Sequence, residues 1–211
     1  MIAEHDWAAF DAVEEMKDHW DRPGWTSSTR AYYWMLTFPD ATPLIDHAGH
    51  CQKELRHLAF DDIHADGLHL TLGRIGRVDE IDSGHLDRLV AKAHERRPES
   101  FTLQAVPLTA SRGAIRYSVA PWNPVLHLHE ALFAAGAGAG IPQRKPTSLL
   151  RPHLGIAYCN RPVSADIVRN AIRPLRELGA VDVAVQNVRL VELRREGQAY
   201  RWQVIHSLEF G

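Results

Sequence analysis

The chain has 211 residues, 45% of them hydrophobic and 24% charged, a composition typical of a globular protein with one large core or two small lobes. Its formal net charge is −2, which argues against a protein that coats duplex nucleic acid by neutralising phosphates. A nucleic-acid substrate would therefore be small or an end. Cys51 and Cys159 form no paired CxxC spacing, so a disulfide scaffold or a zinc ribbon has no support.

The N-terminal stretch 4–19 mixes acidic and apolar residues at helical spacing, which predicts an amphipathic helix. This stretch lacks the basic start and the apolar run of a signal peptide. No segment approaches the roughly 20 apolar residues that a membrane-spanning helix needs. We therefore expect a cytoplasmic protein that does not enter a membrane.

After a loop at 22–28, the two halves of the chain predict the same order of elements. The first half predicts strand 32–38, helix 40–57, strand 68–75, helix 82–96 and strand 101–106. The second predicts strand 114–119, a helix from about 124, strand 153–159, helix 164–178 and a strand from 181, before a hairpin of 187–194 and 200–208. The expected fold is α+β, a single domain of residues 1–211 with duplicated β-α-β-α-β lobes at about 30–106 and 113–208. Pseudo-twofold symmetry would relate the lobes around a central cleft.

A short pattern is repeated in the two halves. Leu68-His69-Leu70-Thr71-Leu72-Gly73 returns as Pro152-His153-Leu154-Gly155-Ile156-Ala157. Because alternate side chains of a strand share a face, His69 and Thr71 would face the cleft, as would His153 and Gly155, with the aliphatic residues in the core. Two imidazoles that face one cleft can act as proton donor and acceptor for a phosphodiester, with the Thr71 hydroxyl as a donor to the phosphate.

These motifs resemble the two H-x-[T/S]-hydrophobic motifs of the 2H phosphoesterase superfamily, in particular its 2′-5′ RNA ligase-like or cyclic phosphodiesterase branch. The segments 34–38 and 151–160 look like those of its actinobacterial members, and the resemblance covers about 25–208. It implies a bilobal fold and chemistry without metal or cofactor on 2′,3′-cyclic phosphates or 2′-5′ bonds of RNA ends or small nucleotides. By position, His69 and His153 would be catalytic and Thr71 would bind phosphate.

The second motif departs from the family at Gly155, where a Thr or Ser is normal. Loss of one donor to a developing oxyanion costs on the order of a hundredfold in rate. Two interpretations follow: a phosphoesterase in which water or a backbone amide substitutes for the hydroxyl, or a binding module for nucleotides or RNA ends with weakened catalysis. In either case we expect a monomer that binds a small nucleotide or RNA end, and neither a membrane nor duplex DNA.

Further residues could contact a substrate. The guanidinium of Arg151 suits phosphate oxygens if the second histidine strand begins early enough to turn it toward the cleft. Trp25 could stack a nucleobase, as could Tyr32 and Trp34, although packing in the core is the alternative for aromatic residues near strands. Tyr158 faces the core by alternation. The stretch 136–146, rich in glycine and proline, predicts a loop that could overhang the cleft or be a plain surface insertion.

A metal site is the competing possibility. Histidines and a cysteine cluster in sequence between positions 47 and 64, namely His47, His50, Cys51, His57 and His64. The spacing matches no H-E-x-x-H or paired CxxC pattern, so a solvated helix face rich in histidine is the favoured interpretation and no metal is expected.

Overall fold

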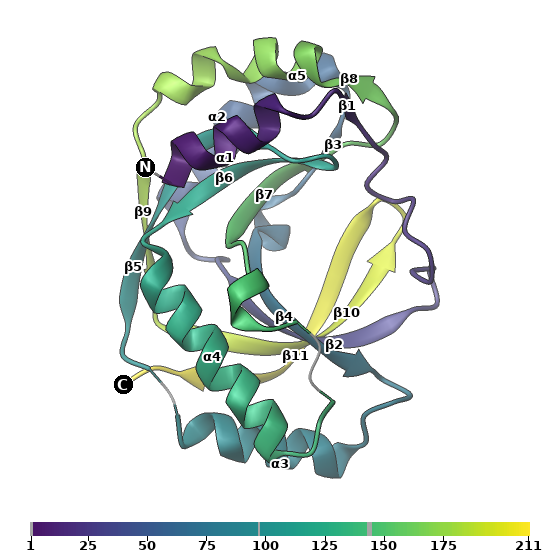
Figure 1. Ribbon diagram of the computed structural model, residues 1–211, viewed down its shortest axis with the longest axis vertical. Coiled ribbons are helices and arrows are strands. Elements are labelled where there is room, and N and C mark those ends of the chain that lie inside the picture. The colour runs from purple at the N-terminus through teal and green to yellow at the C-terminus, as the bar shows by residue number, and fades with distance from the viewer. Residues whose placement is uncertain (1, 97, 143–144) are drawn as a thin grey trace.

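The computed structural model describes residues 2–96, 98–142 and 145–211, and its strands within these ranges form a two-stranded, a four-stranded and a five-stranded sheet (Figure 1). The four-stranded sheet has the order β11 (Ala199–Glu209), β10 (Asn187–Glu196), β2 (Arg30–Thr37), β4 (His69–Arg77). The five-stranded sheet has the order β3 (Asp61–Asp62), β7 (His153–Tyr158), β6 (Ala114–Ala120), β5 (Phe101–Ala110), β9 (Val181–Val185). The pair β1 (Glu15–Met16) and β8 (Val163–Ser164) completes the set.

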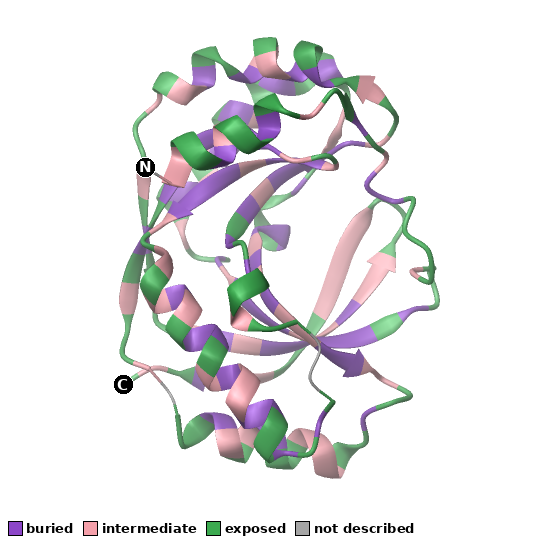
Figure 2. Ribbon diagram, in the orientation of Figure 1, coloured by how far each residue is buried: buried purple, intermediate pink, exposed green. Residues whose placement is uncertain are grey.

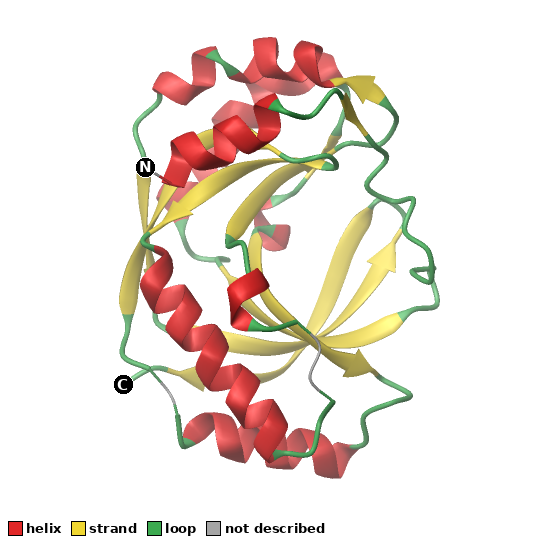
Figure 3. Ribbon diagram, in the orientation of Figure 1, coloured by secondary structure: helices red, strands yellow, loops and turns green. Residues whose placement is uncertain are grey.

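The helices are α1 (Ile2–Asp11), α2 (Thr42–Leu55), α3 (Ser83–His94), α4 (Trp122–Gly138) and α5 (Ala165–Ile172), with short 3-10 turns at 56–58, 65–67, 147–149 and 174–177. Tyr117 and Ser118, which are neighbours on β6, contact α2 and α1 respectively. Because consecutive residues of a strand point to opposite faces, these two helices cover opposite faces of the five-stranded sheet. Helices α3 and α4 pack together against the four-stranded sheet (Figure 3).

The two histidine strands lie next to one another at the centre of the molecule (Figure 1). Their aliphatic residues alternate with the motif residues and are buried, with exposed fractions of 0% for Leu70 and 2% for Leu154. Figure 2 shows buried residues concentrated on the central strands and on the inner sides of the helices. The core therefore lies behind both motifs and fixes which side of each strand faces the cleft.

The predicted β-α-β-α-β order is confirmed in both halves, and the fold is α+β as expected. The sheets do not follow the expected lobes of 30–106 and 113–208, however. Strand β5, expected with the first lobe, pairs with β6 and β9, while the C-terminal hairpin β10–β11 pairs with β2. Strands far apart in the chain can pair in this way because register and apolar faces decide the partner, and neither is visible within one half alone.

The N-terminal helix predicted over 4–19 is wrong in its second half. Helix α1 ends at Asp11, and the following backbone donors bind other segments: Lys17 N–H donates to the Arg112 carbonyl and His19 N–H to the Cys159 carbonyl. These long-range bonds and the burial of Met16 compete successfully with helix propensity. Helix α4 also continues to Gly138, beyond the predicted start of the 136–146 loop; Gln143 and Arg144 lie outside the described residues.

Truncation of Leu70 to alanine should lower the free energy of unfolding by about 2–5 kcal/mol, because it removes buried methyl groups and leaves a cavity behind the first motif. Urea denaturation followed by circular dichroism measures this change. Ile205→Ala, at a side chain 41% exposed on β11, is the matched control and should cost less than about 1 kcal/mol. Equal losses for the two variants would contradict the assignment of Leu70 to the core.

Candidate active site

Each motif histidine is held by its own backbone. The Nδ1 atom of His69 donates to the carbonyl of Gly67 at 2.7 Å, and that of His153 to the carbonyl of Arg151 at 2.8 Å. A carbonyl can only accept, so Nδ1 carries the proton in both rings and Nε2 has the free lone pair when the ring is neutral. The same two-residue step fixes the same tautomer in both motifs, which makes each Nε2 available as a base.

Both rings line one cavity of about 460 Å³ between the two sheets. Its walls include Thr71, Gly155 and Trp25, so the structure brings together five of the six predicted site residues with the two histidines among them. The remaining lining residues are Arg22, Pro23, Tyr33, Arg74, Ser111, Gly113, Ala114, Leu193, Tyr200, His19 and Tyr158. A cavity of this size accommodates a nucleotide.

The sixth predicted residue, Arg151, is placed differently. Its guanidinium donates to the carbonyls of Ser148 and Leu150 and lies 5.9 Å from the centre of the Trp122 ring, outside the cavity lining. Arg151 thus contacts the site through its carbonyl, which orients the second imidazole. Of the aromatic candidates, Tyr32 and Trp34 belong to the hydrophobic core, at 8% and 3% exposure.

Burial lowers the pKa of His69, although the bond to the Gly67 carbonyl opposes this change. The ring of His153 is exposed toward the cavity, whose walls partly remove it from bulk water. This desolvation, together with the positive charge of Arg116, lowers the pKa of His153 to about 4. Both rings are therefore neutral near pH 7, and an anion between them would favour protonation of one.

A third histidine lies in the same cavity, contributed by the N-terminal segment. His19 is 9% exposed, stacks on Tyr158 with ring centres 4.0 Å apart, and lies between Arg22 (3.4 Å to Nδ1) and the Tyr200 hydroxyl (3.1 Å to Nε2). Arg22 can only donate, so the neutral ring donates from Nε2 to Tyr200. Burial, followed by the charge of Arg22, lowers the pKa of His19 to about 3.

Sequence reasoning missed these residues for identifiable reasons. His19 is the last residue of the predicted helix 4–19 and Arg22 lies in the loop after it, where a single histidine gives no signal. Tyr158 is buried, as alternation predicts, but its ring forms part of the cavity wall. Tyr200 reaches the site from the C-terminal hairpin. The sequence predicts this hairpin in the second lobe, whereas it pairs with β2 of the first.

The histidines of the 47–64 segment do not gather into a ligand set. His47 binds the Tyr117 hydroxyl at 2.7 Å, and the His57 ring donates from Nδ1 to the carbonyl of Glu54. Across 2–96, 98–142 and 145–211, no three His, Cys, Asp or Glu side chains converge as a metal site would require. In the same ranges no helix is long and apolar enough to cross a membrane.

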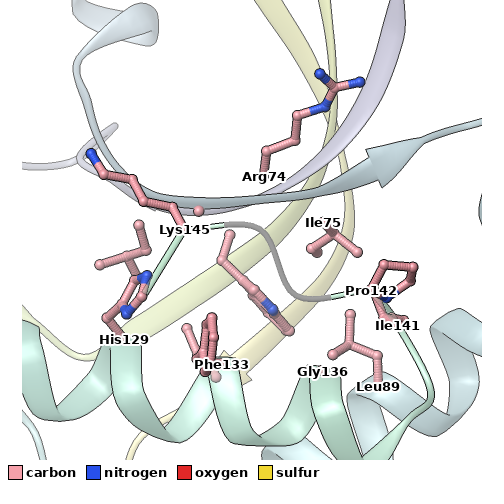
Figure 4. Close-up of a pocket in the computed structure, with 13 residues that line it drawn as sticks. Arg74, Ile75, Leu89, His129, Phe133, Gly136, Ile141, Pro142 and Lys145 are labelled. Atoms are coloured by element: carbon pink, nitrogen blue, oxygen red, sulfur yellow. The ribbon is translucent and has the colours of Figure 1, made fainter. Parts of the chain in front are cut away.

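A second cavity, shown in Figure 4, lies on the opposite side of the four-stranded sheet, against α3 and α4. Its volume is about 60 Å³ and its walls are mainly apolar, including Leu89, Phe133 and Ile141. Arg74 borders both cavities, and in Figure 4 its guanidinium extends away from the apolar side chains. This second cavity is too small for a nucleotide.

Comparison with known families agrees with this arrangement. The family model for the 2′-5′ RNA ligase superfamily matches residues 43–197. The chain belongs to this superfamily. The resemblance to 2H phosphoesterases that the two motifs indicate is thereby confirmed, and membership supports phosphoesterase activity at nucleotide or RNA phosphates. No curated protein matches the sequence.

Solved structures share the fold of this superfamily member. LigT of E. coli in its apo form has a TM-score of 0.63 at 16% identity, with 86% of this chain and 98% of LigT covered. TT0787 of Thermus thermophilus has a TM-score of 0.62 at 16% identity, covering 85% and 97%. Usb1 of Kluyveromyces marxianus has 0.51 at 10% identity, covering 87% and 99%. LigT has been crystallised with ATP, NADP+, 3′-AMP and phosphate.

The lowered pKa of His19 predicts a dependence of stability on acid. Between pH 6.5 and 3 the unfolded chain takes up a proton at this position and the folded chain does not, so stability falls as the pH falls. His19 alone contributes a loss of about 1.4 kcal/mol per pH unit in that window. His19→Gln should remove this part of the slope, measured by urea denaturation at pH 7, 6 and 5.

The matched control for this prediction is His57→Gln, which removes an exposed imidazole. The slope of stability against pH should be closer to that of the parent protein in this control than in His19→Gln. The opposite order would show that desolvation of His19 does not contribute to acid sensitivity.

Proposed function

We propose that the protein is a metal-independent phosphoesterase of the cytoplasm that opens 2′,3′-cyclic phosphates or cleaves 2′-5′ phosphodiester bonds of small nucleotides or RNA ends. The observation that carries the proposal is the pair of imidazoles with matching tautomers on the walls of one cavity. Nucleotide and phosphate complexes of LigT, a structure with the same fold, support the substrate class. We propose that it acts as a monomer.

The chemistry follows from the two rings. One neutral imidazole accepts a proton at Nε2 from a water molecule, whose oxygen forms a bond to phosphorus. The bond between phosphorus and the ribose oxygen breaks, and the other imidazole, protonated at Nε2, gives that oxygen its proton. The proton taken and the proton given balance, so each turnover leaves the pair with the two roles exchanged. The hydroxyl of Thr71, two residues after His69, donates to a phosphate oxygen as charge builds up.

Replacement of either histidine by alanine should reduce turnover of 2′,3′-cyclic nucleotides by at least about a hundredfold, because each ring carries one proton transfer. Chromatography of products formed in the presence of EDTA measures this loss and also tests metal independence. His127→Ala on α4, outside the cavity, is the control and should retain the parent rate. Unchanged turnover in either motif variant, or complete loss with EDTA, would refute the proposal.

Trp25 is proposed to contact the nucleobase. Its ring lies at the cavity edge-on to Tyr33 and Tyr200, with ring centres 6.2 Å and 6.1 Å apart, which forms an aromatic end to the site. Stacking of a base on an aromatic ring is worth about 1–3 kcal/mol. The phosphate would then lie toward the histidines and the base toward the N-terminal segment.

Trp25→Ala should raise KM for a cyclic nucleotide by about tenfold and leave kcat within about threefold, since the contact is remote from phosphorus. Steady-state kinetics measures both constants, and Trp122→Ala, an indole outside the cavity, is the matched control. A fall in kcat with unchanged KM would place Trp25 outside the base site.

A second candidate function rests on Gly155, which lacks the hydroxyl of the second motif. The protein would then hold a nucleotide or RNA end in the same cavity without efficient turnover. Saturable binding of 3′-AMP, measured by calorimetry, with no detectable hydrolysis of cyclic or 2′-5′-linked nucleotides would favour this function over the first.

A further inference from the structure

At Gly155 the second motif has no hydroxyl, and the side chain of Ile63 lies close to the space that a serine or threonine side chain would occupy. A Cβ atom placed on Gly155 would meet Cδ1 of Ile63 at 3.0 Å, closer than ordinary van der Waals contact. Ile63 is 6% exposed, and its N–H donates to the Ile156 carbonyl at 2.8 Å. An apolar group therefore lies against the position from which the family motif donates to phosphate.

A cation lies directly across the ladder from this gap. Strand β6 pairs with β7 so that Arg116 is opposite Gly155 and Ser118 is opposite His153. Directly opposed residues of an antiparallel pair have side chains on the same face, with Cβ atoms about 5 Å apart. Arg116 therefore extends from the face that carries the second motif, next to the place of the missing side chain.

The charge of Arg116 has no direct counter-ion in the described residues. Its Nε atom is buried and has no hydrogen-bond partner. The carboxylate that influences it is Asp6 of α1, which accepts a 2.7 Å bond from the Ser118 hydroxyl, and no ion pair within 4.0 Å joins Asp6 to Arg116 among those residues. A half-buried guanidinium without a paired carboxylate is costly and attracts an anion.

The positive charge of Arg116 affects the imidazole of His153. Arg116 is the second cause, after burial, of the lowered pKa of His153, which places its positive charge near that imidazole. A guanidinium presents several N–H donors in a planar fork, which matches phosphate oxygens better than a single hydroxyl does. Arg116 is not itself among the residues that line the cavity, so its fork reaches a phosphate between the histidines only by turning past Gly155, which it opposes in the ladder.

We propose that Arg116 binds the phosphate of the substrate and replaces the hydroxyl that the second motif lacks at Gly155. This inference deepens the proposed function and rests on a phosphate binding between His69 and His153. The phosphate would then be contacted by the neutral hydroxyl of Thr71 from one wall and by the charged guanidinium of Arg116 from the other. The absence of a hydroxyl at Gly155 is then no loss of phosphate binding.

Inorganic phosphate is the probe that tests Arg116 without need of turnover. Titration of the parent protein should shift the ¹⁵Nε–H resonance of Arg116 in NMR spectra in a saturable way. Arg116→Gln should weaken phosphate affinity by about 10- to 100-fold, because a charge-assisted contact is lost. Arg88→Gln on exposed α3 makes the same change in net charge and is the matched control, expected within twofold of the parent.

A compensating variant separates phosphate binding from a structural role. Gly155→Ser returns a hydroxyl to the second motif, and Ile63→Val provides room for the new Cβ. Introduced together into Arg116→Gln, these two changes should recover at least fivefold of the lost phosphate affinity. A residue that only maintained the fold would not be rescued by a hydroxyl on the neighbouring strand.

The outcomes distinguish this inference from the proposed function. If the parent protein hydrolyses cyclic nucleotides and Arg116→Gln binds phosphate as tightly as the parent, the inference fails and the function stands. If no substrate is hydrolysed while phosphate binding still depends on Arg116, the inference stands and the hydrolytic function fails. An Arg116 resonance that does not respond to saturating phosphate would also overturn the inference, even if the glutamine variant does not fold.

Discussion

The hydrogen bond from each imidazole Nδ1 to a carbonyl two residues earlier is the interaction on which the site depends. These bonds, at 2.7 Å and 2.8 Å, use the backbone of Gly67 and Arg151 and thus do not require a particular side chain as partner. They fix the tautomer, and with it which nitrogen of each ring is free to exchange protons in the cavity. Because the partner is a carbonyl just before the strand, the geometry follows from the way each strand begins.

The two sheets hold the imidazoles of His69 and His153 on opposite walls of one cavity. Ile63 lies close to both motifs. A Cβ on Gly67 would come within 3.2 Å of its Cγ2, and one on Gly155 within 3.0 Å of its Cδ1. The side chain therefore packs against the backbone that orients the first histidine and against the second motif. Behind the motifs, Leu70 and Leu154 anchor the strands in the core. Close packing on both sides limits how far the walls can move apart.

Much of this site could be predicted because its central residues follow a period of two. Alternation along the strand predicts that His69 and Thr71 share a face even when the neighbouring strands are unknown, and the same holds for His153 and Gly155. Arg116 could not be found in this way, since its relation to Gly155 exists only in the register between β6 and β7. His19 and Tyr200 approach from distant segments that pack on each other. Local periodicity shows which way a side chain points, whereas tertiary pairing decides what it meets.

Because strands from distant parts of the chain pair in each sheet, the two walls of the cleft can form only in a certain order during synthesis. All strands of the five-stranded sheet have left the ribosome once residue 185 has emerged. The sheet that bears His69 has by then only β2 and β4, and an isolated strand pair is marginally stable in water. It becomes four-stranded when the hairpin of residues 187–209 arrives. The sheet that carries His153 can therefore form before the sheet that carries His69 is complete, and the two imidazoles face one cavity only once the hairpin has joined.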